Sequence, residues 1–208
     1  MEKITPVRGG PPEVQRDRAI LTRIALLTAA RATFGEAGFQ VARTNDIVAR
    51  AGVTRGAMYH HFRDKEDLFE AVFREVTADL DRQGRAAVVN WQGDLWSKMR
   101  EAFARHLRLV AASREFQQIL LVDGPAVLGW ARWRDIQSQF IASDTAEALL
   151  ELRKSGVLAG DPPPGLANLI QAALNDAALS IAHAVDPTTF SDEALAAFHF
   201  LLDGMRNR

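Results

Sequence analysis

Apolar residues recur at intervals of three and four along most of the 208-residue chain, and the two-residue alternation typical of a half-buried strand is absent from the sequence. Glycine and proline clusters interrupt this pattern and separate about nine helices. The spacing therefore predicts an all-α fold. The first helix is expected between about Asp17 and Glu36, with an inward stripe formed by Ile20, Ile24, Leu27, Ala30 and Phe34.

Two glycines mark the turns around the next helices. Gly38 can end the first helix in a left-handed conformation. Gly52 can supply the positive φ of a sharp turn between two short helices, expected at about 45–51 and 54–62. The pattern of two short helices joined by a tight turn predicts a helix-turn-helix unit.

Three polar residues are placed to cap helices. Thr44, Thr54 and Asp64 each precede a predicted helix, and their side-chain oxygens can accept from backbone N–H groups that have no partner within the helix. The helix after Asp64 is expected to continue into the late 80s. It would carry the chain as one rigid element from the helix-turn-helix unit into the rest of the molecule.

The chain is expected to divide into three parts: a flexible tail at 1–15, a helix-turn-helix domain at 16–63 and a larger helical bundle at 64–208. The tail is rich in proline and glycine and poor in apolar residues, so it lacks the means to pack. In the bundle, further helices are expected at about 94–112, 114–122, 130–154, 165–184 and 192–206.

Charge is unevenly distributed, although the net charge is only −1. Residues 1–65 contain 11 Lys and Arg against 6 Asp and Glu, whereas residues 66–208 contain 14 against 20. A basic segment of this kind indicates a local site for a polyanion, because attraction to phosphates depends on where the charge lies. A chance fluctuation in composition is the alternative.

Several classes of function lack their residues. There is no cysteine, which excludes disulfides and thiolate chemistry and suits a reducing cytoplasm. The sequence has no apolar signal region and no run of about 18 apolar residues, so we expect a cytoplasmic protein without a membrane span. The motifs of di-iron proteins, zincins, serine hydrolases and P-loop NTPases are absent. We therefore predict neither an enzyme nor a bound cofactor.

One face of the second short helix has no evident reason to be buried. Met58 and Phe62, four residues apart, are expected to point inward, which leaves a face that contains Arg55, Gly56, Ala57, Tyr59 and His60. In the major groove of DNA, Arg55 could make a bidentate contact to guanine, and Ala57 could touch a thymine methyl group. With phosphate contacts from the flanking polar groups, the expected DNA-binding residues are Arg43, Thr44, Thr54, Arg55, Gly56, Ala57, Tyr59, His60 and Lys65.

The segment from Asp46 to Phe62, DIVARAGVTRGAMYHHF, followed by Lys65, resembles the signature of the TetR family of bacterial transcriptional regulators. The resemblance extends over about residues 26–73 and is specific, since Gly52, Tyr59, Phe62 and Lys65 occur in register. It implies an N-terminal DNA-binding domain and a C-terminal domain for ligand binding and dimerisation. The C-terminal half resembles the family in layout only.

Alternatives remain for single residues of this motif. Tyr59 could pack at a helix junction, Arg55 could be a solvated surface charge, and His61 is expected to be structural rather than a DNA contact. His60 and His61 do not make a metal site, because neighbours on a helix point about 100° apart and no further ligand stands at a suitable spacing.

Aromatic residues gather in the expected bundle, where all four tryptophans fall between positions 91 and 133. They could form a hydrophobic core, or they could line a pocket for a lipophilic or aromatic effector with a few polar groups that orient it. The expected pocket residues are Trp96, Phe103, His106, Phe116, Asp123, Trp130, Trp133 and Asn175.

The last two expected helices, near 165–184 and 192–206, are apolar around most of their circumference. Such a helix needs two partners, and a second copy of the same helices would supply one in a two-fold homodimer. Burial within one chain is the alternative. Together these features predict a ligand-responsive repressor that binds a palindromic operator as a homodimer and is released by a small-molecule effector. A DNA-binding regulator or architectural protein without an effector is the other interpretation.

Overall fold

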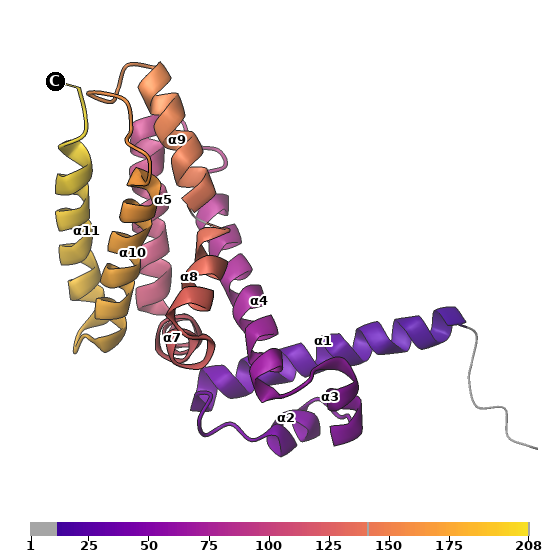
Figure 1. Ribbon diagram of the computed structural model, residues 1–208. Helices are drawn as coiled ribbons and strands as arrows, with labels where there is room; N and C mark the ends of the chain where they lie inside the picture. Colours follow the sequence, from indigo (N-terminus) through magenta and orange to yellow (C-terminus); the bar gives the residue numbers. More distant parts are fainter. Residues whose placement is uncertain (1–11, 141, 208) are drawn as a thin grey trace, which may run out of the picture.

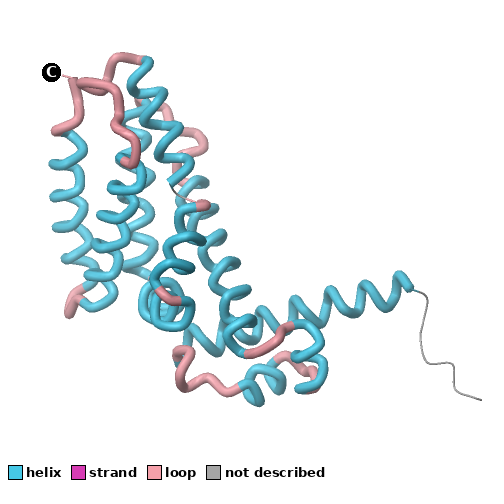
Figure 2. Tube along the Cα trace, viewed as in Figure 1, coloured by secondary structure: helices cyan, strands magenta, loops and turns pink. Residues whose placement is uncertain are grey.

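The computed structural model describes residues 12–140 and 142–207 (Figure 1). Over these ranges the chain forms helices and loops, and a lone antiparallel bridge joins Leu158 to Arg206 (Figure 2). The predicted all-α fold is confirmed. A small N-terminal group of helices lies at one end of a larger helical bundle, and a single long helix runs between them (Figure 1).

The N-terminal group consists of α1 (Pro12–Ala37), α2 (Thr44–Arg50) and α3 (Arg55–His61). The predicted turn glycines have the expected conformations, with φ of 77° at Gly38 and 66° at Gly52. Met58 and Phe62 point inward as predicted, and Ile47 is fully buried beside them. The inward face of α3 is thus used for packing and its other face stays available.

Helix α1 starts earlier than the pattern predicted, at Pro12, because the first turn of a helix needs no proline N–H. Residues 1–11 of the predicted tail lie outside the described part of the chain. Burial of Ile20 and Ile24 was wrongly predicted, since these side chains are 52% and 54% exposed. The N-terminal half of α1 extends beyond α2 and α3, so only its C-terminal half has a core to face (Figure 1).

The long helix is α4 (Lys65–Ala86), and Asp64 caps it as predicted by accepting from Asp67 N at 2.7 Å. Its inward residues, from Leu68 to Leu80, are buried. The first turns of α4 pack against α1, whereas its later turns pack against the bundle (Figure 1). One rigid helix therefore belongs to both parts of the molecule.

The bundle is built from the remaining helices, and α5 packs against α9, α10 and α11 within it (Figure 1). Their bounds are α5 (Leu95–Ala112), α6 (Arg114–Phe116), the π-helix η1 (Gln117–Asp123), α7 (Gly124–Leu128), α8 (Trp130–Ser138), α9 (Ala142–Lys154), α10 (Leu166–His183) and α11 (Pro187–Asp203). The predicted single helix at 130–154 is two helices, because the chain turns after Ser138. The last helix begins before the predicted Asp192, with Pro187 in its first turn and Asp186 as its cap.

The segment η1 to α7 comes very close to α4. A Cβ added at Gly124 would lie 2.7 Å from an atom of the Phe73 ring and 2.8 Å from the Trp133 ring. Trp133 is fully buried, and its Nε1 donates to the carbonyl of Leu120 at 2.7 Å. The wide turn of the π-helix and the absence of a side chain at Gly124 let the bundle close tightly on the connecting helix.

Candidate nucleic-acid interface and its link to a cavity

The start of α3 is fixed by local chemistry. Thr54 Oγ1 accepts from Ala57 N at 3.1 Å, which confirms the predicted cap. Val53 N donates to the Val48 carbonyl at 3.0 Å across the turn at Gly52. These bonds hold α2 and α3 as a helix-turn-helix and define which side of α3 faces outward.

The outward side of α3 carries the predicted polar residues. Arg55, Gly56, Tyr59 and His60 are exposed, and Ala57 is half-buried. The Arg55 guanidinium lies 5.5 Å from the centre of the Tyr59 ring, and its Nη2 is 3.4 Å from the Tyr59 hydroxyl. A Cβ at Gly56 would meet only Thr54 Oγ1, at 3.9 Å. This face is therefore flat near its start and positively charged.

Arg43 and Thr44 flank this face at the start of α2. Arg43 is exposed and occupies the N-cap position, while Thr44 is half-buried in the first turn. The prediction that Thr44 caps α2 was wrong, since no side chain caps this helix. Both residues lie at the entry to the helix-turn-helix, Arg43 just before α2 and Thr44 at its first position.

Lys65 has an internal partner. Its Nζ donates to the carbonyl of Phe39 at 2.5 Å and lies 4.1 Å from the centre of the Phe39 ring. Burial lowers the pKa of this ammonium group. The sequence motif indicated a phosphate contact here, whereas the structure places the side chain on the loop between α1 and α2.

Asp123 binds the backbone N–H of Phe39, whose carbonyl binds Lys65. Its Oδ2 accepts from Phe39 N at 2.8 Å, and the aspartate is buried. The loop before α2 is thus held by α4 through Lys65 and by η1 through Asp123. The sequence predicted Asp123 in an effector pocket, and nothing local to it indicated a partner 84 residues away.

A second contact between the two parts was not predicted from the sequence. Arg31 of α1 pairs with Glu115 of α6 at 2.6 Å and with Asp79 of α4 at 2.8 Å. The hydrogen bonds that Arg31 donates to Glu115 and to Asp79 raise its pKa above the ordinary value, with Glu115 as the main cause. Three helices meet at this guanidinium, so a shift of α4 or α6 would also displace α1.

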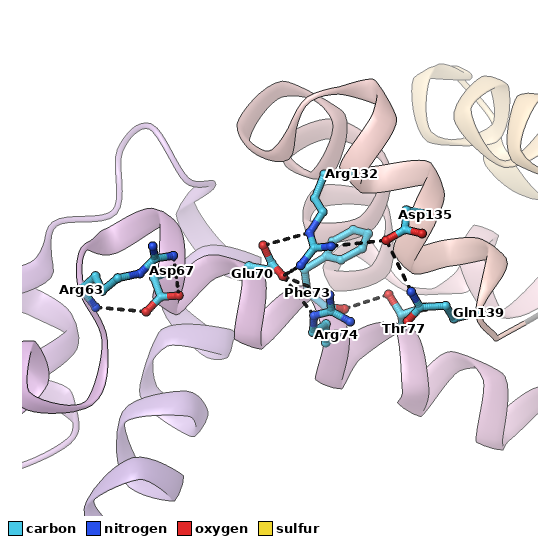
Figure 3. Close-up of polar contacts among 9 residues, drawn as sticks. All are labelled: Arg63, Asp67, Glu70, Phe73, Arg74, Thr77, Arg132, Asp135 and Gln139. Carbon is cyan, nitrogen blue, oxygen red and sulfur yellow. Dashed lines mark hydrogen bonds and ion pairs between the residues drawn. The ribbon is translucent and has the colours of Figure 1, made fainter.

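The helix α8 is attached to α4 by a further ion-pair network, which Figure 3 shows. Arg132 Nη2 lies 2.7 Å from Glu70 Oε1, and Arg74 donates to the same oxygen at 3.1 Å. Arg132 also pairs with Asp135 at 3.3 Å. These cations hold the pKa of Glu70 below its usual value, with Arg132 as the main cause.

A cavity of about 500 Å³ lies among α4, α5, α9 and α10. Its wall includes Gly84 and Arg85 of α4, Phe103 and His106 of α5, Ala148 of α9 and Leu174 of α10. The His106 ring is reached from the cavity but is densely surrounded by protein, and this desolvation lowers its pKa to about 4. The cavity volume is within the range of small-molecule sites.

The structure does not bring the eight predicted pocket residues together. Phe103 and His106 line the main cavity. Trp130 and Asn175 line a smaller cavity of about 140 Å³ between α8 and α10. Trp96, Phe116 and Trp133 are buried in the core. The residues of α4 and α9 that complete the main cavity were missed, because neither helix shows a local sign of it.

Residues 12–140 and 142–207 contain neither a metal-ligand cluster nor a membrane-spanning helix. No group of three or more His, Cys, Asp or Glu side chains there could hold a metal ion. None of the helices in those ranges is long and apolar enough to cross a membrane.

Comparison with known proteins gives matches in both parts of the chain. Residues 26–72 match the family described as bacterial regulatory proteins, tetR family, and residues 96–205 match the tetracyclin repressor-like C-terminal domain. An HTH-type transcriptional repressor of Mycobacterium tuberculosis is 31% identical over 154 residues, which cover 73% of this chain and 77% of the relative.

Solved structures agree. A TetR-family transcriptional regulator from Pectobacterium atrosepticum has a TM-score of 0.82 and 34% identity, and the match covers 93% of this chain and 98% of that one. The regulator FadR of Bacillus subtilis, solved in complex with stearoyl-CoA, has a TM-score of 0.66 and covers 84% and 96%. Its identity is 17%, so this likeness concerns the fold.

Proposed function

Since the chain belongs to the TetR family of DNA-binding transcriptional regulators, which are not enzymes, we propose that it is a ligand-controlled repressor. It binds a palindromic operator as a homodimer, and a small molecule in the main cavity releases it. The repressor role follows the relative from M. tuberculosis, and the effector role is supported by the ligand-bound relative of the same fold.

The outward face of α3 reads the operator. Arg55 stands near the start of this helix, where a recognition helix meets base edges. Its stacking against Tyr59 orders the guanidinium before DNA binds, so less side-chain entropy is lost on binding. Arg43, Thr44 and His60 contact phosphates on either side and set the register.

The main support for effector control is that α4 contacts both the loop before α2 and the main cavity. At its first residue α4 holds the loop before α2 through Lys65, and near its end it lines the cavity with Asp81, Gly84 and Arg85. A ligand that displaces the end of α4 therefore moves the base of the helix-turn-helix. To shift a 1:99 equilibrium to 99:1, the ligand must prefer the released state by about 5.5 kcal/mol.

Dimerisation uses α10 and α11. Both helices bury one face inside the chain and also expose large apolar residues: Leu169 is 69%, Phe200 81% and Leu201 63% exposed. Two copies of this pair would bury these side chains across a two-fold axis. The axis would hold two α3 helices about 34 to 36 Å apart or more, in successive major grooves.

The test of DNA reading starts from selection of binding sites out of a random duplex library, which should return a two-fold symmetric sequence. On that operator, Arg55→Ala should lose about 1 to 3 kcal/mol of discrimination at one base pair per half-site. The matched variant Arg43→Ala should weaken binding to selected and random DNA equally. If Arg55→Ala lowers the affinity for selected and random DNA equally, Arg55 does not recognise a base.

A further inference from the structure

The main cavity has an apolar interior and a charged mouth. Val88, Met99, Phe103 and Leu174 are at most 7% exposed and form the interior. The charged lining residues are more accessible, and they are Asp81, Arg85, Lys98, Asp144, Glu147 and Glu151. An occupant of this cavity therefore needs an apolar body and a polar end.

Carboxylates outnumber cations at the mouth by four to two. Arg85 is already engaged, at 2.8 Å from Asp81 and 2.6 Å from Asp144. Glu147 makes no hydrogen bond or ion pair with the described residues. Burial raises the pKa of Asp81, and nearby Asp144 adds to this effect, so the ionised carboxylate is incompletely compensated. A positive charge brought by a ligand would find Glu147 without an ion-pair partner and Asp81 incompletely compensated.

An anionic ligand would be disfavoured at the same place. Among the described lining residues, Lys98 is the cation without an ion-pair partner, so a ligand carboxylate would gain this one attraction. It would also meet four carboxylates against Lys98, Arg85 and the neighbouring Lys154, which pairs with Glu151 at 2.6 Å. His106 adds no positive charge at neutral pH, because its pKa is lowered to about 4. The neutral ring can instead donate or accept one hydrogen bond inside the cavity.

The space for an apolar body is made by small residues on three helices. Gly84 of α4 faces Ala102 of α5 and Ala148 of α9 around the cavity. Gly84 has no positive φ, and a Cβ added to it would meet no atom within 4 Å. Neither backbone geometry nor crowding therefore requires glycine at this position, although glycine weakens a helix interior. The missing side chain leaves space that forms part of the cavity.

We propose that the effector is an amphipathic organic cation, such as an alkyl or aryl ammonium compound, whose charge lies against Asp144 and Glu147 and whose apolar part lies between Met99, Phe103 and Leu174. This inference names the ligand class of the cavity used in the proposed function and rests on it. The ligand charge competes with Arg85 for Asp144. Since Arg85 links α4 to α9, this competition loosens the end of α4.

Calorimetric titration with three ten-carbon probes tests the ligand class directly: decyltrimethylammonium, decanoate and decanol at pH 7.5. The two ionic probes are used below their micelle concentrations and decanol below its solubility limit. The ammonium should bind at least about tenfold more tightly than the carboxylate, because the mouth is net negative. Glu147→Gln and Asp144→Asn should each weaken ammonium binding about three- to tenfold and leave decanol binding unchanged. Asp161→Asn, which removes a carboxylate outside the cavity, should change none of the three.

Steric variants show whether the probes occupy this cavity. Gly84→Leu should abolish binding of all three probes, whereas Gly84→Ala should retain it, and thermal unfolding of both variants checks that they are folded. Three results would overturn the proposal. They are tighter binding of decanoate than of the ammonium, no binding of any probe, and an ammonium affinity that is unchanged in both Glu147→Gln and Asp144→Asn.

Different experimental results would contradict the ligand class and the proposed function. Saturable ammonium binding that leaves operator affinity unchanged would contradict effector control while the ligand class stands. Release of DNA by decanoate alone would contradict the ligand class while effector control stands.

Discussion

The peptide groups on either side of Phe39 show how single residues join the two parts of this regulator. Asp123 accepts from its N–H and Lys65 donates to its carbonyl, so α4 and η1 meet on one residue of the loop before α2. The sequence motif predicted that Lys65 contacts DNA phosphate. It could not show which acceptor the ammonium reaches, because Phe39 is 26 residues away in the chain.

Replacement of Lys65 by Met tests this assignment. Loss of a charged hydrogen bond to a carbonyl is expected to lower the free energy of unfolding by about 1 to 3 kcal/mol, measured by urea denaturation. The slope of log K against log salt for operator binding should stay unchanged. Arg43→Met, the control, should reduce that slope by about one unit without loss of stability. A reduced slope for Lys65→Met would show that Lys65 contacts a DNA phosphate.

At the scale of elements, prediction succeeded where local chemistry decides the structure. The cap at Asp64, the cap at Thr54 and the turn at Gly52 depend on residues within a few positions of each other. Prediction failed where distant contacts decide. The periodic pattern did not show that residues 117–123 form a π-helix, and no glycine or proline marks the break after Ser138.

The contact between η1 and the loop before α2 can be tested through the Phe39 amide. Asp123→Ala should leave this buried N–H without an acceptor, which costs about 1 to 3 kcal/mol, and its hydrogen exchange should accelerate. Asp123→Asn keeps a carbonyl oxygen at the same place and should largely preserve the protection. Exchange that is equally slow in both variants would show that Asp123 does not hold the loop.

For the whole molecule, the sequence indicated the outer apolar face of the last two helices, and the structure gives its members. Phe200 and Leu201 are exposed on α11 and Leu169 is exposed on α10. The cavity was beyond sequence reasoning, because its wall combines α4, α5, α9 and α10 and much of its volume comes from small side chains. Most of the aromatic residues predicted to line an effector pocket are packed in the core instead.

Self-association is expected to depend on that outer face. Phe200→Glu should convert the dimer to a monomer at micromolar concentration in sedimentation velocity, since a charge would have to be buried across the two-fold axis. Leu21→Glu, which changes an exposed leucine on α1 far from α11, should leave the dimer intact (Figure 1). A Phe200→Glu variant that remains dimeric would place the interface elsewhere.

Control of DNA binding from the cavity can be measured as the operator affinity in the presence of a cavity ligand. Fluorescence anisotropy of a labelled operator duplex would be measured with and without a saturating compound whose calorimetric binding is abolished by Gly84→Leu. We expect the compound to raise the dissociation constant of the wild-type protein at least about tenfold, a coupling of about 1.4 kcal/mol, and to leave that of Gly84→Leu unchanged. A compound that saturates the cavity while the wild-type dissociation constant stays the same would contradict control of DNA binding through α4.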